Sequence, residues 1–315
     1  MATGKPVRFG IAIPQDFIDG PLDLPSLRMF LSHAEALGYE SAWVQEQIVG
    51  SVPILEPVTV LTYAAALTQR LRLGTSVMLT VWRNPIQLAK SLTSLDHLSQ
   101  GRLTVGVGIG NQRPEDAAFG IPLGRRARRF VEGIGVMKAL WTQPTATFAG
   151  EYWQLAGIAQ EPKPVQRPHP PLWFGARESA ALRRAVRLGS GWMGAGSSSN
   201  ADFKSQAVTI RGFLDNAKRD PATFTLSKRV YIAVDANKAR AEERLRTWFG
   251  IRYGRADMAS RVAVWGGANE CLDRLAELVE SGAEHLLLNS AFDHMEHLDL
   301  FAQEIIPHLT GAVRA

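Results

Sequence analysis

Three glycines stand at every second position in the segment TVGVGIG: Gly106, Gly108 and Gly110. In a strand, alternate residues share a face, so the glycines leave one face bare while valine and isoleucine cover the other. Glycine weakens a strand, and a bare face therefore indicates that something else needs the space. Two interpretations are open: a flat ring system lies against this strand, or large side chains from neighbouring strands fill the gap.

The glycine spacing does not fit a dinucleotide-binding fingerprint. That fingerprint is G-x-G-x-x-G across a strand-to-helix turn, with an acidic residue about 20 positions later. Here the glycines follow G-x-G-x-G within a strand, and no acidic residue ends the next expected strand. The segment therefore predicts a different use of its bare face.

Other reactive side chains form no recognised catalytic or metal-binding set. Cys271 is the single cysteine, which excludes an internal disulfide and a cysteine-built metal site. His294 and His297 are three positions apart without an evident third ligand, so we expect a solvated surface and predict no metal. The G-x-S-x-G motif of a nucleophile elbow does not occur in the sequence.

The basic side chains are scattered apart from one cluster, GRRARRF at 124–130. The formal net charge is +5, from 35 Lys and Arg against 30 Asp and Glu. The four arginines precede apolar residues at helical spacing, which indicates the solvated start of an amphipathic helix; an anion site is the alternative. No nucleic-acid motif accompanies them, so we predict no nucleic-acid partner.

Composition indicates a globular protein that can bury a large core. The chain has 315 residues, of which 46% are hydrophobic and 21% charged. The first residues lack the apolar run of a leader, and no stretch of about 18 apolar residues occurs. We therefore expect a cytoplasmic protein that does not enter a membrane.

Short apolar segments alternate with amphipathic ones along the chain, which predicts strands joined by helices. Eight such pairs in one chain of this length favour a closed (β/α)₈ TIM barrel with short insertions, as a single domain over residues 1–315. FAGEYWQL is expected to be a small hairpin inserted in this series. The expected strands are 7–13, 41–45, 71–79, one within 101–110, 171–176, 191–196, 227–235 and 283–289.

Five segments in this order resemble those of the bacterial-luciferase-like, flavin-dependent oxidoreductases. They are LDHLSQGRLTVGVGIGN, EGIGVMKALW, FAGEYWQL, KPVQRPHPPLWFGA and the pair GW at 191–192. The resemblance covers nearly the whole chain. It implies a (β/α)₈ barrel, usually a homodimer, that binds FMN or the deazaflavin coenzyme F420 at the carboxyl ends of the strands.

The resemblance also implies positions for the cofactor. A non-proline cis peptide often lies against the flavin ring at the third strand, where this chain has Ser76 and Val77. Two strand-to-helix turns are placed for the phosphate, since free backbone N–H groups and helix dipoles favour an anion there. The other edge of the ring and these two turns correspond to Gly108, Ile109, Gly110 and Asn111, to Gly175, Ala176 and Arg177, and to Gly194, Gly196 and Ser197.

The chain departs from the family pattern after the second strand, where many relatives have an acidic residue followed by histidine. Here the two residues are Glu46 and Gln47. Glutamine cannot titrate, so Glu46 is the candidate acid or base, or else it holds a ring nitrogen or a backbone group. Trp82, Arg83 and Arg113 follow strand ends and either contact the substrate or pack within loops.

These residues imply an oxidoreductase whose cofactor supplies the redox chemistry. The basic balance of the chain and the Ser76–Val77 pair favour F420, with its polyanionic tail, and hydride transfer to or from a small organic substrate. The alternative is FMN, with monooxygenation by reduced flavin from a separate reductase. A flavin-binding paralogue without activity is the third possibility, because the family histidine is missing.

Overall fold

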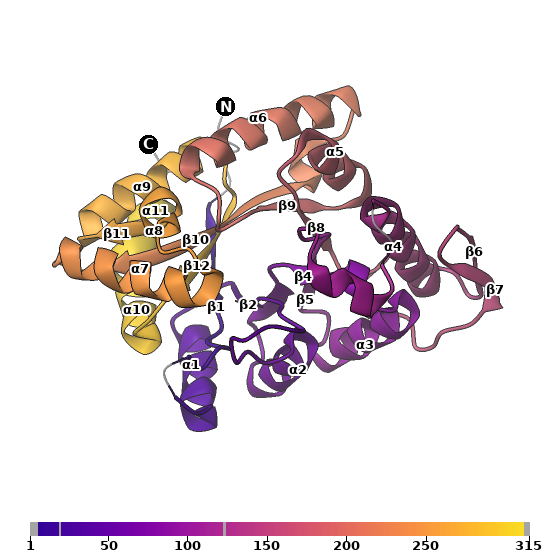
Figure 1. The fold of residues 1–315 in the computed structure, drawn as a ribbon, viewed down its shortest axis with the longest axis horizontal. Helices are drawn as coiled ribbons and strands as arrows, with labels where there is room; N and C mark the ends of the chain where they lie inside the picture. Colours follow the sequence, from indigo (N-terminus) through magenta and orange to yellow (C-terminus); the bar gives the residue numbers. More distant parts are fainter. Residues whose placement is uncertain (1–5, 19, 122–123, 312–315) are drawn as a thin grey trace.

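Parallel strands close into a barrel in the computed structural model, which describes residues 6–18, 20–121 and 124–311. Figure 1 shows the strands as a ring with helices around it. Every neighbouring pair in the ring is parallel, and β10 pairs with β9 on one side and β12 on the other. In ring order the strands are β1 (Arg8–Ala12), β2 (Ser41–Val44), β3 (Arg72–Thr75), β5 (Leu103–Gly108), β8 (Leu172–Gly175), β9 (Gly191–Gly194), β10 (Thr225–Val234) and β12 (His285–Ser290).

The predicted (β/α)₈ barrel is thereby confirmed, with each of the eight expected strands in its place in the ring. β4 (Met78–Leu79) continues β3 and pairs with β5, and β11 (Val264–Gly266) pairs with β10 beside the ring. The expected hairpin is formed by β6 (Ala146–Ala149) and β7 (Gln154–Ile158). In the described part of the chain, no helix combines the length and apolar content needed to cross a membrane.

Helices connect the strands and cover the outer face of the ring. Proline at the first helical position and a capping side chain begin several of them: Asn84, for example, accepts from Ile86 N at 2.9 Å. The helices are α1 (Leu24–Ala36), α2 (Pro57–Leu67), α3 (Pro85–Leu98), α4 (Arg126–Thr142), α5 (Ser179–Leu188), α6 (Asn200–Asn216), α7 (Lys238–Tyr253), α8 (Met258–Val262), α9 (Ala268–Glu280), α10 (His294–Leu300) and α11 (Ile306–Gly311). Shorter turns are η1 (Thr80–Trp82), η2 (Pro114–Phe119), η3 (Pro221–Thr223) and η4 (Phe301–Ile305).

Two tryptophans fill the lower part of the barrel. Trp43 and Trp173 stack with ring centroids 5.2 Å apart. Their rings fit because strand residues beside them are glycine: a Cβ on Gly74 would lie 2.3 Å from Trp43, and one on Gly191 would lie 2.7 Å from Trp173. The barrel floor is thus a closed layer that a ligand cannot enter without displacing an indole.

His285 lies buried in the same floor between two hydroxyl groups. Its Nε2 is 2.9 Å from Ser41 Oγ, and its Nδ1 is 2.7 Å from Ser227 Oγ. Burial lowers the pKa of His285 to about 3, so the ring is neutral in the folded protein at neutral pH. His297 is also buried, where its Nε2 accepts from Val234 N at 3.2 Å. The expectation that His297 lies on a solvated surface is therefore wrong, because α10 turns this side chain toward β10.

Candidate functional site

The bare face of β5 is filled by a neighbouring segment of the same chain. A Cβ on Gly106 would lie 1.8 Å from the carbonyl oxygen of Thr75, and one on Gly108 would lie 2.7 Å from Val77. Gly175 on β8 faces the same valine at 2.9 Å. The space that the sequence assigned to a ring or to large side chains therefore holds the Thr75 backbone and the Val77 side chain.

The peptide bond between Ser76 and Val77 is cis, as the resemblance implied. It lies between β3 and β4 and brings Val77 into the barrel interior. Val77 remains half-buried while it packs on an apolar cluster. That cluster consists of Ala12, Trp43, Trp173, Met193 and Leu287. Val77 is thus an apolar platform at the upper end of the packed interior. A side chain therefore lies where the sequence analysis expected a bare wall.

The turn after β5 departs from the strand pattern. β5 ends at Gly108, and Gly110 has φ +68°, a conformation that glycine adopts readily. Gly110 therefore belongs to a turn and not to the bare strand face. Ile109 packs partly buried and its carbonyl accepts from Arg126 Nη2, while Asn111 is exposed.

A buried arginine that the sequence analysis did not identify anchors the platform. Arg229 on β10 donates through Nη1 to Ser76 O at 2.7 Å. Its other end contacts the hydroxyls of Tyr231 and Tyr253. The Arg229 Nε is buried without a hydrogen-bond partner, and Gly196 lies so close that a Cβ there would be 2.8 Å from it.

The two predicted phosphate turns lie next to each other, after β8 and β9. Arg177 donates from Nη2 to Ser197 Oγ, which joins the turns across the barrel rim. Ser199 caps α6 by accepting from Asp202 N, so the helix N-terminus begins at the second turn. Arg177 is exposed, and its guanidinium is available to an anion at this rim.

Lys228 on β10 supports the second turn from below. Its ammonium donates to Ala195 O, to Ser198 O at 2.7 Å and to Ser198 Oγ at 3.1 Å. These bonds occupy the carbonyls of the turn from its buried side. Burial lowers the pKa of Lys228 to about 7, and the nearby Arg229 and Arg177 add to this shift.

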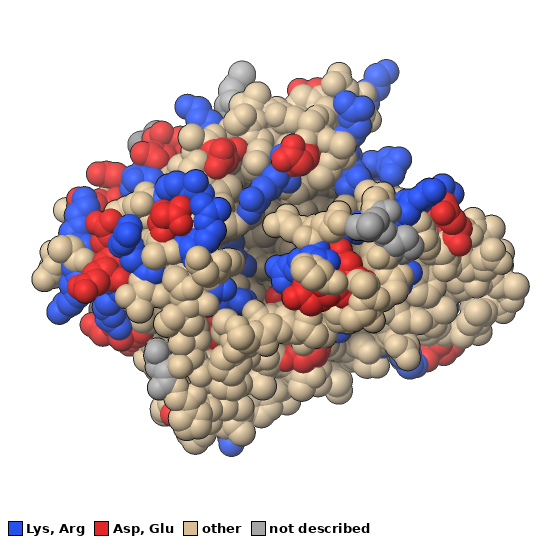
Figure 2. Space-filling model, in the orientation of Figure 1, with Lys and Arg blue, Asp and Glu red and all other residues tan. Residues whose placement is uncertain are grey.

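A hollow lies above these elements. Figure 2 shows it near the centre of the view, with Lys and Arg side chains and also Asp and Glu side chains around its edges. The glycine turns, the Val77 platform, the unpartnered Arg229 Nε and the exposed Arg177 together offer an apolar surface beside polar groups that can donate hydrogen bonds. These residues fit a planar ring that carries a phosphate.

The comparison with protein families agrees with this geometry. The model of the luciferase-like monooxygenase family matches residues 7–285. This chain belongs to that family.

Relatives of this luciferase-like chain use both candidate cofactors. An uncharacterised protein of Mycobacterium tuberculosis is 43% identical over 140 residues, which span 44% of this chain and 49% of that protein. An F420-dependent glucose-6-phosphate dehydrogenase of Beutenbergia cavernae is 28% identical across 89% of this chain and 92% of its own length. An FMNH(2)-dependent dimethylsulfone monooxygenase of Pseudomonas putida is 30% identical, and the match covers 66% of this chain and 61% of the monooxygenase.

Solved structures support the fold of the luciferase-like chain. The coenzyme F420 dependent tetrahydromethanopterin reductase of Methanopyrus kandleri superposes with a TM-score of 0.81. It is 20% identical, and the match covers 96% of this chain and 99% of the reductase. At this identity the likeness concerns the barrel itself.

Glu46 of this luciferase-like chain is held in a buried ion pair. Its side chain is 0% exposed, and it accepts from Leu79 N and from Arg83 Nε at 2.7 Å. Burial raises the pKa of Glu46, and the Arg83 charge opposes that shift. Both carboxylate oxygens are thus engaged, which fixes the segment after β4; proton transfer by Glu46 stays a prediction.

Gln47 connects two loops at the mouth of the barrel. Its Nε2 donates to Val52 O at 2.8 Å, and its Oε1 accepts from Arg252 Nη1 at 2.7 Å. Arg252 belongs to the last turn of α7 and precedes Tyr253, which contacts Arg229. Gln47 stands where many relatives have histidine. Through Arg252 and the adjacent Tyr253, it is connected to Arg229.

Two of the predicted substrate residues, Trp82 at the end of η1 and Arg113 just before η2, are brought together by packing of Trp82 on η2. Trp82 donates from Nε1 to Asp116 Oδ1 at 2.7 Å and stacks on Phe119 at 4.9 Å. The guanidinium carbon of Arg113 lies 5.6 Å from the Trp82 ring. Arg83 is directed instead to Glu46 and to Glu56, 2.8 Å away.

The arginine cluster at the start of α4 is only partly solvated. Arg126 is 8% exposed and forms an ion pair with Asp116, which also receives the Trp82 indole N–H. The expectation of a solvated helix start is therefore wrong for Arg126, because η2 folds back over α4. Arg126 instead ties η2 to the turn after β5 through the Ile109 carbonyl.

Proposed function

We propose that this chain is an oxidoreductase that binds F420 above Val77 and exchanges a hydride with a small organic substrate. The observation that carries the proposal is the pair of neighbouring turns after β8 and β9, joined by Arg177 and Ser197, beside an apolar platform. The Lys and Arg side chains at the edge of the hollow, which lie there beside Asp and Glu side chains, suit the polyanionic tail of this cofactor. The F420-dependent relative that matches 89% of the chain supports the same choice.

The residues of this chain bind and orient the cofactor. Arg177, Ser197 and the N-terminus of α6 would hold the phosphate, and Lys228 would keep the turn in place. Val77 would support the ring, with the Arg229 Nε as a donor at its edge. When bound, F420 accepts or donates a hydride at its ring carbon and reacts poorly with oxygen.

The FMN alternative rests on the dimethylsulfone monooxygenase relative, which matches 66% of the chain. FMN has a single phosphate, which the Arg177–Ser197 turn could also bind, but no polyanionic tail for the basic rim. It would imply monooxygenation with reduced flavin from a separate reductase. A homodimer, a cytoplasmic location and the choice between enzyme and inactive paralogue stay predictions.

Titration of the apoprotein with F420 and with FMN tests the proposal. Micromolar binding of F420, seen as a change in its visible spectrum, is expected, with FMN at least about tenfold weaker. Oxidation or reduction of bound F420 by a substrate panel separates an enzyme from an inactive paralogue. Tighter binding of FMN, or binding of neither, contradicts the choice of F420.

A further inference from the structure

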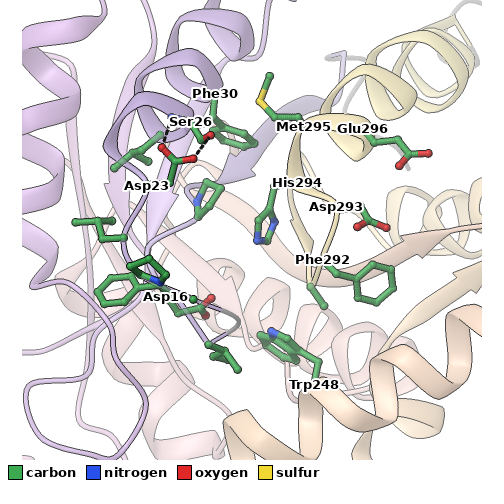
Figure 3. Close-up of a pocket in the computed structure, with 18 of the residues that line it drawn as sticks. Asp16, Asp23, Ser26, Phe30, Trp248, Phe292, Asp293, His294, Met295 and Glu296 are labelled. Atoms are coloured by element: carbon green, nitrogen blue, oxygen red, sulfur yellow. Dashed lines mark hydrogen bonds between the residues drawn. The ribbon is translucent and has the colours of Figure 1, made fainter.

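A second cavity of about 630 Å³ opens beside the strand ends of β1 and β12. It lies between the segment after β1, the start of α1, the segment after β12 and the middle of α7. Figure 3 shows His294 extending into it, with Phe30 and Met295 on one side and Trp248 and Phe292 on the other. This volume is in the range of pockets that hold a small organic molecule.

The cavity wall is aromatic and carries excess negative charge. Its apolar lining includes Phe17, Phe30, Trp248, Phe292 and Met295. Among the described residues, its charged lining is four carboxylates, Asp16, Asp23, Asp293 and Glu296, and one guanidinium, Arg244.

The one guanidinium that the structure describes in this wall already has a partner. Arg244 pairs with Asp293 through two hydrogen bonds, at 2.5 and 3.0 Å, and lies 3.7 Å above the Phe292 ring. Asp23 accepts from Ser26 N and Ser26 Oγ, and His294 is the other side chain of the described lining that can carry positive charge. Even with His294 protonated, carboxylates outnumber cations in the described lining, so an entering anion would meet excess negative charge. The wall therefore favours an apolar group that is neutral or positively charged.

The inner end of the cavity meets the mouth of the barrel. Ala12 and Leu287 contact the layer that contains Val77. Pro14 and Ala291, which line the cavity, follow them by two and four residues and lie just beyond the ends of β1 and β12. Two residues of chain span at most about 7 Å, so Pro14 lies within that distance of Ala12 in the Val77 layer.

A shared wall also links the cavity to the platform. Trp248 lines the cavity and packs against Tyr231, with ring centroids 5.1 Å apart. Tyr231 contacts Arg229, which binds the carbonyl of Ser76. A molecule in the cavity therefore lies beside the residues that position the cofactor platform.

We propose that this cavity holds the non-reacting part of the substrate, an apolar aromatic or alicyclic group without negative charge, and best an amine. The proposal rests on the proposed function, because it assumes that the reacting carbon extends toward the hollow above Val77. It predicts that sugar phosphates, although used by a relative of this chain, are not substrates here.

Three probes that differ mainly in charge test the substrate class: 2-phenylethylamine, 2-phenylethanol and phenylacetate. Calorimetric titration of the cofactor-free protein is expected to give the amine the tightest binding and phenylacetate about tenfold weaker binding, since one unit of charge near this wall has an effect of that size. Glucose 6-phosphate is expected not to bind there. Equal binding of phenylacetate, or no binding of any probe at millimolar concentration, overturns the proposal.

Two variants test whether the probes bind in this cavity. Met295→Trp fills it and is expected to weaken amine binding about tenfold. Glu296→Lys adds positive charge and is expected to move the preference toward phenylacetate. Glu304→Lys, an exposed change about two helical turns further along, is the matched control and is expected to bind like wild type. Binding that neither cavity variant alters contradicts the location.

The cofactor titration is separate from these measurements, so the two proposals fail in different ways. If F420 binds but the probes do not, the substrate class is wrong and the proposed function stands. If the amine binds in the cavity and neither F420 nor FMN binds, the proposed function is wrong.

Discussion

The hollow above Val77 and the cavity beside β1 and β12 lie at the same end of the barrel, yet they are built in opposite ways. The hollow uses backbone turns, glycines and cationic side chains from β8, β9 and β10. The cavity uses aromatic rings and carboxylates from the β1 and β12 loops and from α7. One end of a barrel thus offers one region suited to a phosphate-bearing cofactor and another suited to an apolar amine.

This difference predicts which substitutions each region should tolerate. A backbone turn binds an anion through N–H groups that substitution leaves in place, so charge and close packing control its affinity. A side-chain cavity depends on the area and charge of its lining. Variants of one region, away from the shared wall of Trp248 and Tyr231, should therefore leave binding at the other region unchanged.

The largest expected effect is that of Arg177→Glu on cofactor binding. Replacing the exposed guanidinium at the rim by a carboxylate removes a charge-assisted contact and adds repulsion, so F420 is expected to bind about 100-fold more weakly. Visible titration measures this change. Arg187→Glu on the outer end of α5 is the control and should bind F420 like wild type. Equal affinities of the two variants would place the phosphate elsewhere.

The platform is expected to respond to the fit between Gly108 and Val77. Gly108→Ala places a Cβ only 2.7 Å from Val77 Cγ2, and β-branched valine has few alternative rotamers. F420 affinity is expected to fall about tenfold through displacement of the platform. Val77→Ala in the same chain removes the clash.

The double variant should therefore bind F420 more tightly than Gly108→Ala alone, and a coupling energy near zero would contradict the contact. Binding of 2-phenylethylamine should be unchanged in all three variants, because the cavity wall is not altered.

A smaller, pH-dependent effect is expected at Lys228. Its pKa of about 7, lowered by burial, means that its positive charge is lost as pH rises through neutrality. F420 affinity is therefore expected to decrease about threefold from pH 6 to pH 8. Lys228→Met should bind more weakly at pH 6 and lose this dependence, whereas exposed Lys204→Met should keep it. The same slope in both variants would rule out Lys228 as its source.

Substitution of His285, in the barrel floor, is expected to have the smallest effect on binding at the hollow and in the cavity. Its pKa is about 3 in the folded protein because of burial, against an ordinary value near 6.5 in the unfolded chain. The contribution of His285 to the free energy of unfolding is thus complete above pH 6.5 and is lost as the pH falls toward 3. About 2 kcal/mol should be lost between pH 7.5 and pH 5.

Urea unfolding at several pH values measures this loss. His285→Asn should show a shallower decrease in the free energy of unfolding below pH 6.5 than the wild type. Affinities for F420 and for the amine at pH 7.5 should stay close to wild type. Parallel pH profiles of the two proteins would contradict a neutral, buried His285.

The order of strands and helices could be predicted from the sequence because it depends on local apolar spacing. The position of the cis peptide, Ser76–Val77, followed from the family resemblance. What fills the face beside Gly106 could not be predicted, since the Thr75 carbonyl reaches it through pairing between distant segments.

The buried cations were harder to predict than the elements that carry them. Lys228 and Arg229 interrupt an otherwise apolar strand, SKRVYIAV, and that interruption was the available signal. Arg126 had no such signal, because its burial depends on η2 folding back over α4. The burial of His297 could not be predicted for a similar reason, since the packing of α10 on β10 decides which side of α10 is solvated.

A crystal structure of the complex with F420 and 2-phenylethylamine tests the central claim most directly. The account predicts the ring on Val77, the phosphate between Arg177 and Ser197, and the amine beside Phe292 and Trp248. A cofactor ring in the cavity between β1 and β12, or a phosphate bound away from the two joined turns, would contradict it.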